Sequence, residues 1–111
     1  MKKIIILCLV LASFSFANQK SDALQKACDK GNMKSCADLG IAYDLGRGVR
    51  QNYSKARKLY KKACDKNNMN ACFNLGILYD NGKGVRQNYS KARKLYKKAC
   101  DGGGMLQLVT I

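Results

Sequence analysis

The strongest constraint on this chain is an internal repeat of 36 residues. Residues 46–65 read GRGVRQNYSKARKLYKKACD, and residues 82–101 read GKGVRQNYSKARKLYKKACD, so only Arg47 and Lys83 differ. The same offset relates two series of cysteines: Cys28, Cys64 and Cys100, and Cys36 and Cys72. A period of this size is typical of repeat proteins, in which each unit buries its apolar face against the next one. The sequence therefore predicts a tandem array rather than one irregular core.

Each unit contains two helical patterns. From Asn52 to Cys64, apolar or small residues recur at spacings of three and one, which is typical of a single helix stripe. A second stripe runs from Ser35 to Asp44 and includes Gly40, where we expect a neighbouring helix to approach closely, as at Gly76. The patterns predict a half unit at about 20–30 and helices over 34–45, 52–65, 70–81 and 88–100.

Residues suited to turns stand between these patterns. Gly46 and Gly82 follow helix ends, where left-handed backbone geometry is needed. Gly31 and Asn67 occupy matching positions in the shorter turns, and both residue types tolerate positive φ. Asn32 and Asn68 follow these two residues, and we expect each to cap the helix that comes next.

The N-terminus has the pattern of a signal peptide. Met1, Lys2 and Lys3 precede an apolar run from Ile4 to Phe16, and small residues stand at the end of that run. We expect cleavage after Ala17, so that residues 1–17 are removed and the chain is secreted or periplasmic, with no transmembrane segment left. Removal of the two lysines lowers the net charge from +14 to +12.

The cysteine spacing predicts two disulfide bonds, Cys28–Cys36 and Cys64–Cys72. Cysteines eight residues apart in one helix would lie about 12 Å apart, too far for a bridge, but a helix–turn–helix brings them together. A zinc site is the alternative. It would normally use closer cysteine pairs or histidine, and the chain has no histidine. We therefore expect no metal and no cofactor.

Cys100 lacks a partner in this scheme, because position 108 is Leu108. The sequence predicts an unpaired thiol at Cys100, which could join two chains in a disulfide dimer. Residues 102–111 keep the repeat only as far as Met105, as expected of a truncated array. The predicted organisation is a signal peptide at 1–17, helical repeats over 18–101 with units at about 34–65 and 70–101, and a divergent tail at 102–111.

The repeat unit resembles the Sel1-like repeat. The matching features are A/F-x-L-G-x-x-Y, G-x-G-V and K-A-x-x-x-Y-x-K-A, present in both copies. The added cysteine pair is similar to that of the Helicobacter cysteine-rich protein family. The resemblance implies an all-α fold, a superhelical α/α array of the Sel1/TPR-like type stapled by intra-repeat disulfides.

That resemblance also implies an activity. Members of the cysteine-rich family are described as penicillin-binding proteins with β-lactamase activity, so the resemblance implies a weak β-lactam hydrolase that contributes to antibiotic resistance. It further implies recognition by the host immune system. The alternative is a non-catalytic scaffold that binds proteins, peptides or cell-envelope components, and a third reading is a decayed fragment without a stable fold.

The residues themselves show no catalytic motif. None of S-x-x-K, S-D-N and K-T-G occurs, and Ser54 and Ser90 are followed at +3 by Arg57 and Arg93, which cannot act as a base. The catalytic residues of any enzyme here are therefore unknown.

A basic helix face is the candidate binding surface: Lys55, Arg57, Lys58, Lys61, Lys62, Lys91, Arg93, Lys94, Lys97 and Lys98. It is either a solvated surface or a site for an anionic partner, such as a β-lactam, a peptidoglycan-like ligand, a protein or a peptide. We expect no nucleic acid, because no nucleic-acid-binding motif accompanies the charge. The repeated tyrosines, Tyr43/Tyr79, Tyr53/Tyr89 and Tyr60/Tyr96, either pack between helices or line a concave binding surface.

Overall fold

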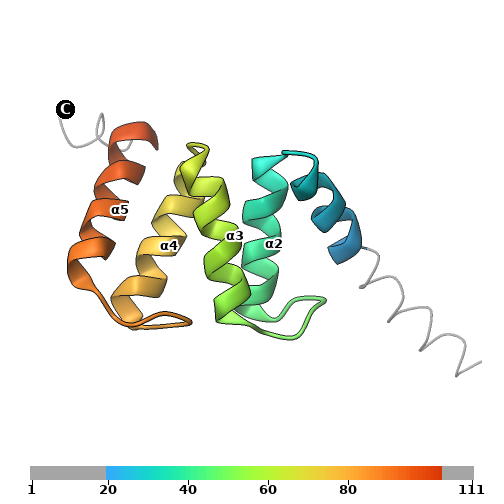
Figure 1. Ribbon diagram of the computed structural model, residues 1–111, viewed down its shortest axis with the longest axis horizontal. Coiled ribbons are helices and arrows are strands. Elements are labelled where there is room, and N and C mark those ends of the chain that lie inside the picture. The colour runs from blue at the N-terminus through green and yellow to red at the C-terminus, as the bar shows by residue number, and fades with distance from the viewer. Residues whose placement is uncertain (1–19, 104–111) are drawn as a thin grey trace, which may run out of the picture.

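The described residues 20–103 of the computed structural model form a row of antiparallel helices (Figure 1). A helical segment over 20–29 precedes four helices: α2 (Met33–Leu45), α3 (Tyr53–Asp65), α4 (Met69–Asn81) and α5 (Tyr89–Gly103). This part of the chain contains no strand, which confirms the predicted all-α repeat array. The predicted signal peptide and residues 104–111 of the tail lie outside the described residues, and the domain boundaries stay predictions.

The helices begin where the sequence predicted caps. The side chains of Asn32 and Asn68 accept hydrogen bonds of 3.0 Å from the backbone N–H groups of Ser35 and Ala71. Asn52 caps α3 in the same way, and Asn88 accepts from the N–H of Lys91 at 3.0 Å. These last two caps were not predicted, although the repeat places the same residue at each helix start.

The turns also have the predicted backbone geometry. Gly46 and Gly82 end α2 and α4 with φ angles of 70° and 65°, in the left-handed region that disfavours other residues. Asn67 adopts φ 69° in the turn between α3 and α4, matching Gly31 at φ 100° one repeat earlier. Two turn lengths therefore alternate along the chain and bring consecutive helices side by side.

Two disulfides join consecutive helices at the short turns. Cys28–Cys36 links the segment 20–29 to α2, and Cys64–Cys72 links α3 to α4, with Cα atoms 4.6 Å and 4.7 Å apart. Both bonds confirm the predicted staples. Cys100 is a free, half-buried cysteine, and the disulfide dimer expected through it stays a prediction.

Small residues let the helices pack closely. Gly40 faces the ring of Tyr60, and Gly76 faces the ring of Tyr96, so that a Cβ atom on either glycine would lie 2.7 Å from a ring carbon. Tyr60 is only 1% exposed and its hydroxyl donates a 3.0 Å hydrogen bond to Asp44. Burial, together with the charge and hydrogen bond of Asp44, raises the pKa of Tyr60 and keeps it a proton donor.

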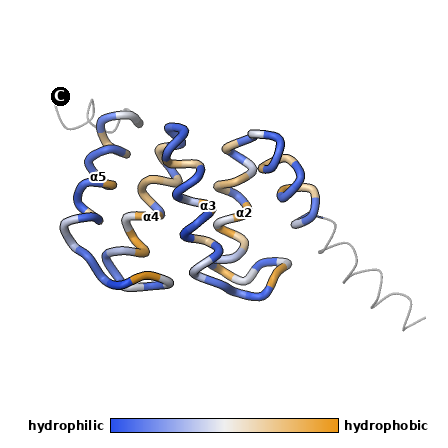
Figure 2. The backbone as a smooth tube through the Cα atoms, in the orientation of Figure 1, coloured by the Kyte–Doolittle hydropathy of each residue, from blue (hydrophilic) through white to orange (hydrophobic). Residues whose placement is uncertain are grey.

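The two helices of a unit differ in polarity. Figure 2 shows apolar residues concentrated on α2 and α4, whereas α3 and α5 are mostly hydrophilic with a narrower apolar stripe. On α3 that stripe is Ala56, Tyr60, Ala63 and Cys64, all buried. α3 and α5 therefore carry most of the lysines and present them to solvent.

Replacing Gly40 with alanine should destabilise the protein by about 1–3 kcal/mol, because the new methyl group overpacks against the fixed ring of Tyr60. Gly76→Ala should cost less at the ring, since Tyr96 is half-buried, although its Cβ would also lie 3.3 Å from the backbone oxygen of Ala92. The gain in helix propensity, about 1 kcal/mol, is common to both variants. Urea unfolding measures the difference, and equal losses in the two variants would contradict this account of the packing.

Removing one staple should also destabilise the fold. Each bridge closes a loop of eight residues, and Cys36→Ser or Cys72→Ser should lower the free energy of unfolding by about 2–3 kcal/mol. The matched control is Cys100→Ser, which breaks no bridge and should change stability by less than about 0.5 kcal/mol. A staple variant as stable as this control would count against the role assigned to the bonds.

Candidate functional site

The ten residues of the predicted basic face do not form one surface. Successive helical residues are about 100° apart, so the basic side chains of α3 fan out over a wide arc. The Lys55 ammonium lies 5.2 Å from the ring centroid of Tyr43 on one side of α3. On the other side, the Arg57 Nε–H donates to the Gly84 carbonyl at 3.3 Å. The structure therefore divides the predicted face between two neighbouring surfaces.

One of these surfaces is an open groove of about 260 Å³ between α3 and α5, with α4 beneath it. It is called the lysine groove here. Residues from all three helices line it: Lys61, Cys64, Asp65, Leu75, Tyr79, Lys91, Lys94, Leu95 and Lys98. Four of the ten predicted basic residues, Lys61, Lys91, Lys94 and Lys98, meet in this one place.

The groove has an apolar floor and a charged rim. Leu75 is buried, and Leu95 and Tyr79 are half-buried in the cluster that packs against the core. Lys61, Lys91 and Lys94 are exposed at the rim. An apolar floor with a few charged groups above it is the usual composition of a ligand site.

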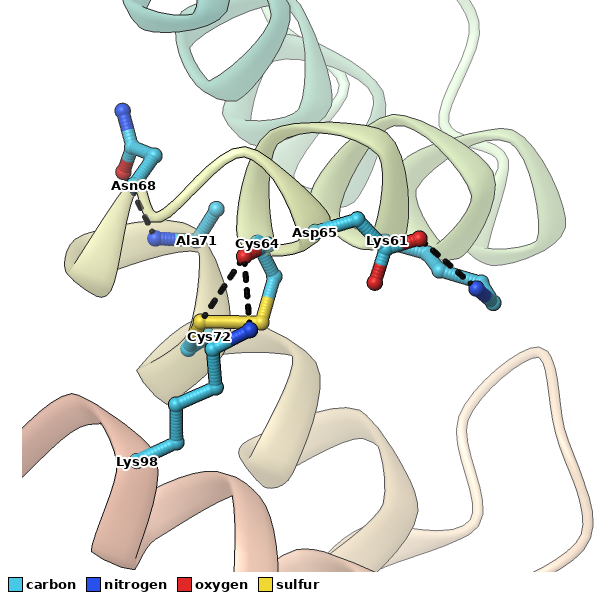
Figure 3. The surroundings of a disulfide bond; sticks show 7 residues. All are labelled: Lys61, Cys64, Asp65, Asn68, Ala71, Cys72 and Lys98. Carbon is cyan, nitrogen blue, oxygen red and sulfur yellow. Dashed lines mark hydrogen bonds and ion pairs between the residues drawn. A yellow bond between two sulfur atoms is a disulfide. The ribbon is translucent and has the colours of Figure 1, made fainter.

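Lys98 crosses the groove from α5 to the stapled turn. Its ammonium donates a 3.0 Å hydrogen bond to the carbonyl oxygen of Cys64, beside the Cys64–Cys72 bond (Figure 3). This contact joins residues 34 positions apart in the sequence, and it fixes an otherwise flexible side chain. It leaves the other donors of the ammonium for a ligand, because a lysine has three N–H groups.

The other lysines of the groove differ in whether a neighbouring group balances the charge of the ammonium. Lys61 pairs with Asp65 at 2.8 Å, and this hydrogen bond and charge raise the pKa of Lys61 (Figure 3). The Lys91 ammonium lies 5.2 Å from the ring centroid of Tyr79. Lys94 has no ion pair or hydrogen bond within residues 20–103. Asp65 is therefore the one carboxylate against four ammonium groups in the lining, and the groove favours an anion.

The tyrosines have separate roles. Tyr60 and Tyr96 pack between helices, and Tyr96 donates a 3.3 Å hydrogen bond to Asp80. The Tyr53 and Tyr89 hydroxyls accept hydrogen bonds from the side-chain amides of Gln51 and Gln87. Tyr79 lies in the floor of the lysine groove. Tyr60 and Tyr96 therefore follow the packing interpretation, and Tyr79 lines a groove while packing against the core.

Two other cavities are less suited to an anion. One, of about 500 Å³, lies between the segment 20–29 and α2, where Asp38 stands among Lys20 and Arg47 at the edge of the described residues. The other, of about 490 Å³, is a shallow surface near Met69 and the end of α5, lined by Lys94, Lys97 and Lys98 together with Asp101. The lysine groove is the more enclosed of the two surfaces that Lys94 and Lys98 share.

The serines that begin α3 and α5 lie outside the lysine groove. Ser54 and Ser90 lie in the first turns of α3 and α5, and no serine is part of the groove lining. In the same part of the chain, no three side chains of the metal-binding types converge. Residues 20–103 also contain no helix long and apolar enough to span a membrane.

A comparison with known protein families identifies the family to which this chain belongs. The Sel1 repeat matches residues 34–68 and 70–104, which together make up more than half of the chain. The chain belongs to the Sel1 repeat family. A comparison with curated proteins gave no match. The chain is similar to several solved structures.

Helicobacter pylori cysteine rich protein B is 34% identical, with a TM-score of 0.73 over 82% of this chain and 68% of that one. This match supports membership of the cysteine-rich branch of Sel1 proteins. A Sel1 repeat protein from Oxalobacter formigenes is 32% identical, with a TM-score of 0.72 over 75% of this chain. A protective antigen of uropathogenic Escherichia coli with an SLR fold is 30% identical, with a TM-score of 0.72. This chain spans 34% and 18% of those two proteins.

Within this Sel1 array, sequence reasoning found the lysines but missed the floor. Leu75 and Leu95 were not singled out, and Tyr79 was left between packing and lining a binding surface, because the sequence does not show which apolar residues border the lysines. The contact of Lys98 with the Cys64 carbonyl was also missed, because it depends on the distance between two repeats. The sequence does contain one relevant signal, which is the repeat. Lys98 follows Lys62 by one repeat and therefore occupies the same position on its helix.

Proposed function

We propose that this Sel1 repeat protein is a disulfide-stapled scaffold that binds carboxylate-bearing ligands in the lysine groove. The observation that carries the proposal is the excess of four ammonium groups over one carboxylate around an apolar floor. A ligand with a carboxylate and an adjoining apolar group would pair with Lys94 and Lys98 and cover Leu75 and Leu95. Each interaction is weak alone, but the groove presents them together.

The proposed location is secreted or periplasmic. Disulfides persist in oxidising compartments, and the two described bonds support an extracytoplasmic protein. The predicted signal peptide at 1–17 supports the same location. In that location, acidic peptides, peptidoglycan-like stem peptides and host proteins are all accessible ligands.

The resemblance to the Helicobacter cysteine-rich proteins extends the proposal to penicillins. A penicillin has one carboxylate and an apolar acyl group, which fit the rim and the floor of the groove. Hydrolysis would further require an activated nucleophile and a group that stabilises the oxyanion. Since no serine lines the groove in the described residues, the contacts support penicillin binding more than β-lactamase turnover.

The groove is tested by the double variant Lys94→Gln, Lys98→Gln. Losing two exposed or half-buried ion pairs, each worth about 0.2–1 kcal/mol, should weaken binding of a fluorescent penicillin about 2- to 30-fold. The matched control is Lys34→Gln, Arg50→Gln, which removes the same charge from positions outside the groove. Fluorescence polarisation at fixed ionic strength measures both, and equal weakening in the two variants would refute a localised site.

Turnover is tested with a chromogenic cephalosporin and purified, oxidised 18–111. We expect binding without sustained hydrolysis, because the groove supplies cations but no nucleophile. The control is the Cys36→Ser, Cys72→Ser variant, which removes both staples. Turnover by the stapled protein that is lost in this control would instead establish a fold-dependent β-lactamase.

A further inference from the structure

The residues that line the lysine groove recur one repeat earlier in the chain. Eight of its nine lining residues correspond by the 36-residue offset to identical residues, and the exception is Lys61, whose counterpart is Gln25. Leu39 and Tyr43 of α2 and Lys55, Lys58, Leu59 and Lys62 of α3 make up the surface that we call the N-terminal groove. The segment 20–29 supplies the other two counterparts, Cys28 and Asp29.

Part of the local geometry is repeated as well. The Lys55 ammonium lies 5.2 Å from the Tyr43 ring centroid, the same distance as Lys91 from Tyr79. Leu39 is buried and Leu59 half-buried, as are Leu75 and Leu95. Lys98 is half-buried and bonded to the Cys64 carbonyl, whereas its counterpart Lys62 is exposed.

The two grooves share α3. Lys55, Lys58 and Lys62 are the α3 lysines of the N-terminal groove, and Lys61 lines the lysine groove. Asp65 is paired with Lys61, and its counterpart Asp29 accepts a hydrogen bond from Gln25. An anionic chain that crosses α3 therefore passes from the lysines of one groove to those of the other.

The distance between the grooves suits a short peptide. Packed helices lie about 8–10 Å apart, so grooves centred on α2 and α4 are at most roughly 20 Å apart. An extended chain covers about 3.3 Å per residue, so about six residues span that distance. The apolar floors favour a peptide with apolar side chains over a glycan, which would leave Leu75 and Leu95 without a partner.

We propose that the two grooves together bind one extended acidic peptide, with a carboxylate and apolar cluster in each groove. This inference rests on the proposed function of the lysine groove and adds the second groove and the ligand class. Because the second contact becomes intramolecular once the first has formed, a peptide with two clusters should bind much more tightly than a peptide with one.

The test uses synthetic peptides and calorimetry on the oxidised chain. A peptide with two Glu-Leu-Glu clusters separated by six flexible residues should bind 1:1, about tenfold or more tightly than a single cluster. A peptide of the same composition with adjacent clusters cannot span α3 and should bind like the single cluster. Either Lys55→Gln, Lys62→Gln or Lys94→Gln, Lys98→Gln should remove the gain, whereas Lys34→Gln, Arg50→Gln should keep it.

The possible failures are distinct. If the single cluster does not bind at all, the proposed function of the lysine groove fails, and this inference fails with it. If the single cluster binds but spacing brings no gain, only the two-groove inference is overturned. It is also overturned if a heparin oligosaccharide binds more tightly than the spaced peptide and loses affinity in both lysine variants, since the ligand class would then be a polyanion without apolar groups.

Discussion

The disulfide across each short turn is the contact on which the rest of the structure depends. It holds the end of one helix against the start of the next, with Cα atoms 4.6 Å and 4.7 Å apart. An array of about two units buries little apolar surface, and many of its core residues are alanine or cysteine. Restricting the unfolded chain is therefore an effective way to stabilise it. The same bond positions the Cys64 carbonyl that receives Lys98.

The fold also explains how so many lysines are accommodated. The chain has 21 basic and 7 acidic residues, and a net charge this far from zero opposes a compact state. The apolar stripe of α3 is narrow, so its lysines remain in solvent, where water screens them. The groove is the exception, because four ammonium groups line it against one carboxylate. Relief of that repulsion by an anion is the physical reason for the proposed binding.

The fold could be predicted from local sequence because its signals are repeated twice. Asn32 and Asn68 cap helices, Gly46 and Gly82 end them, and cysteines eight residues apart define the turns. α5 was predicted to end at Cys100 but continues to Gly103, with Gly102 beside the side chain of Met69. The site was predicted only in part. A helix stripe shows which residues face outward, but the neighbours of Lys98 and Tyr79 depend on how one repeat packs on the next.

The central claim is that the lysine groove binds carboxylates. The most direct measurement is a titration of isotopically labelled, oxidised protein with an acidic peptide, followed by NMR of the backbone amides. The account predicts saturable shifts at Tyr79, Leu95 and Lys98, accompanied by shifts at their counterparts Tyr43, Leu59 and Lys62 where the second groove binds as well, with little change in the loop at 46–52. Unsaturable shifts spread over all exposed lysines, or shifts centred outside both grooves, would contradict it.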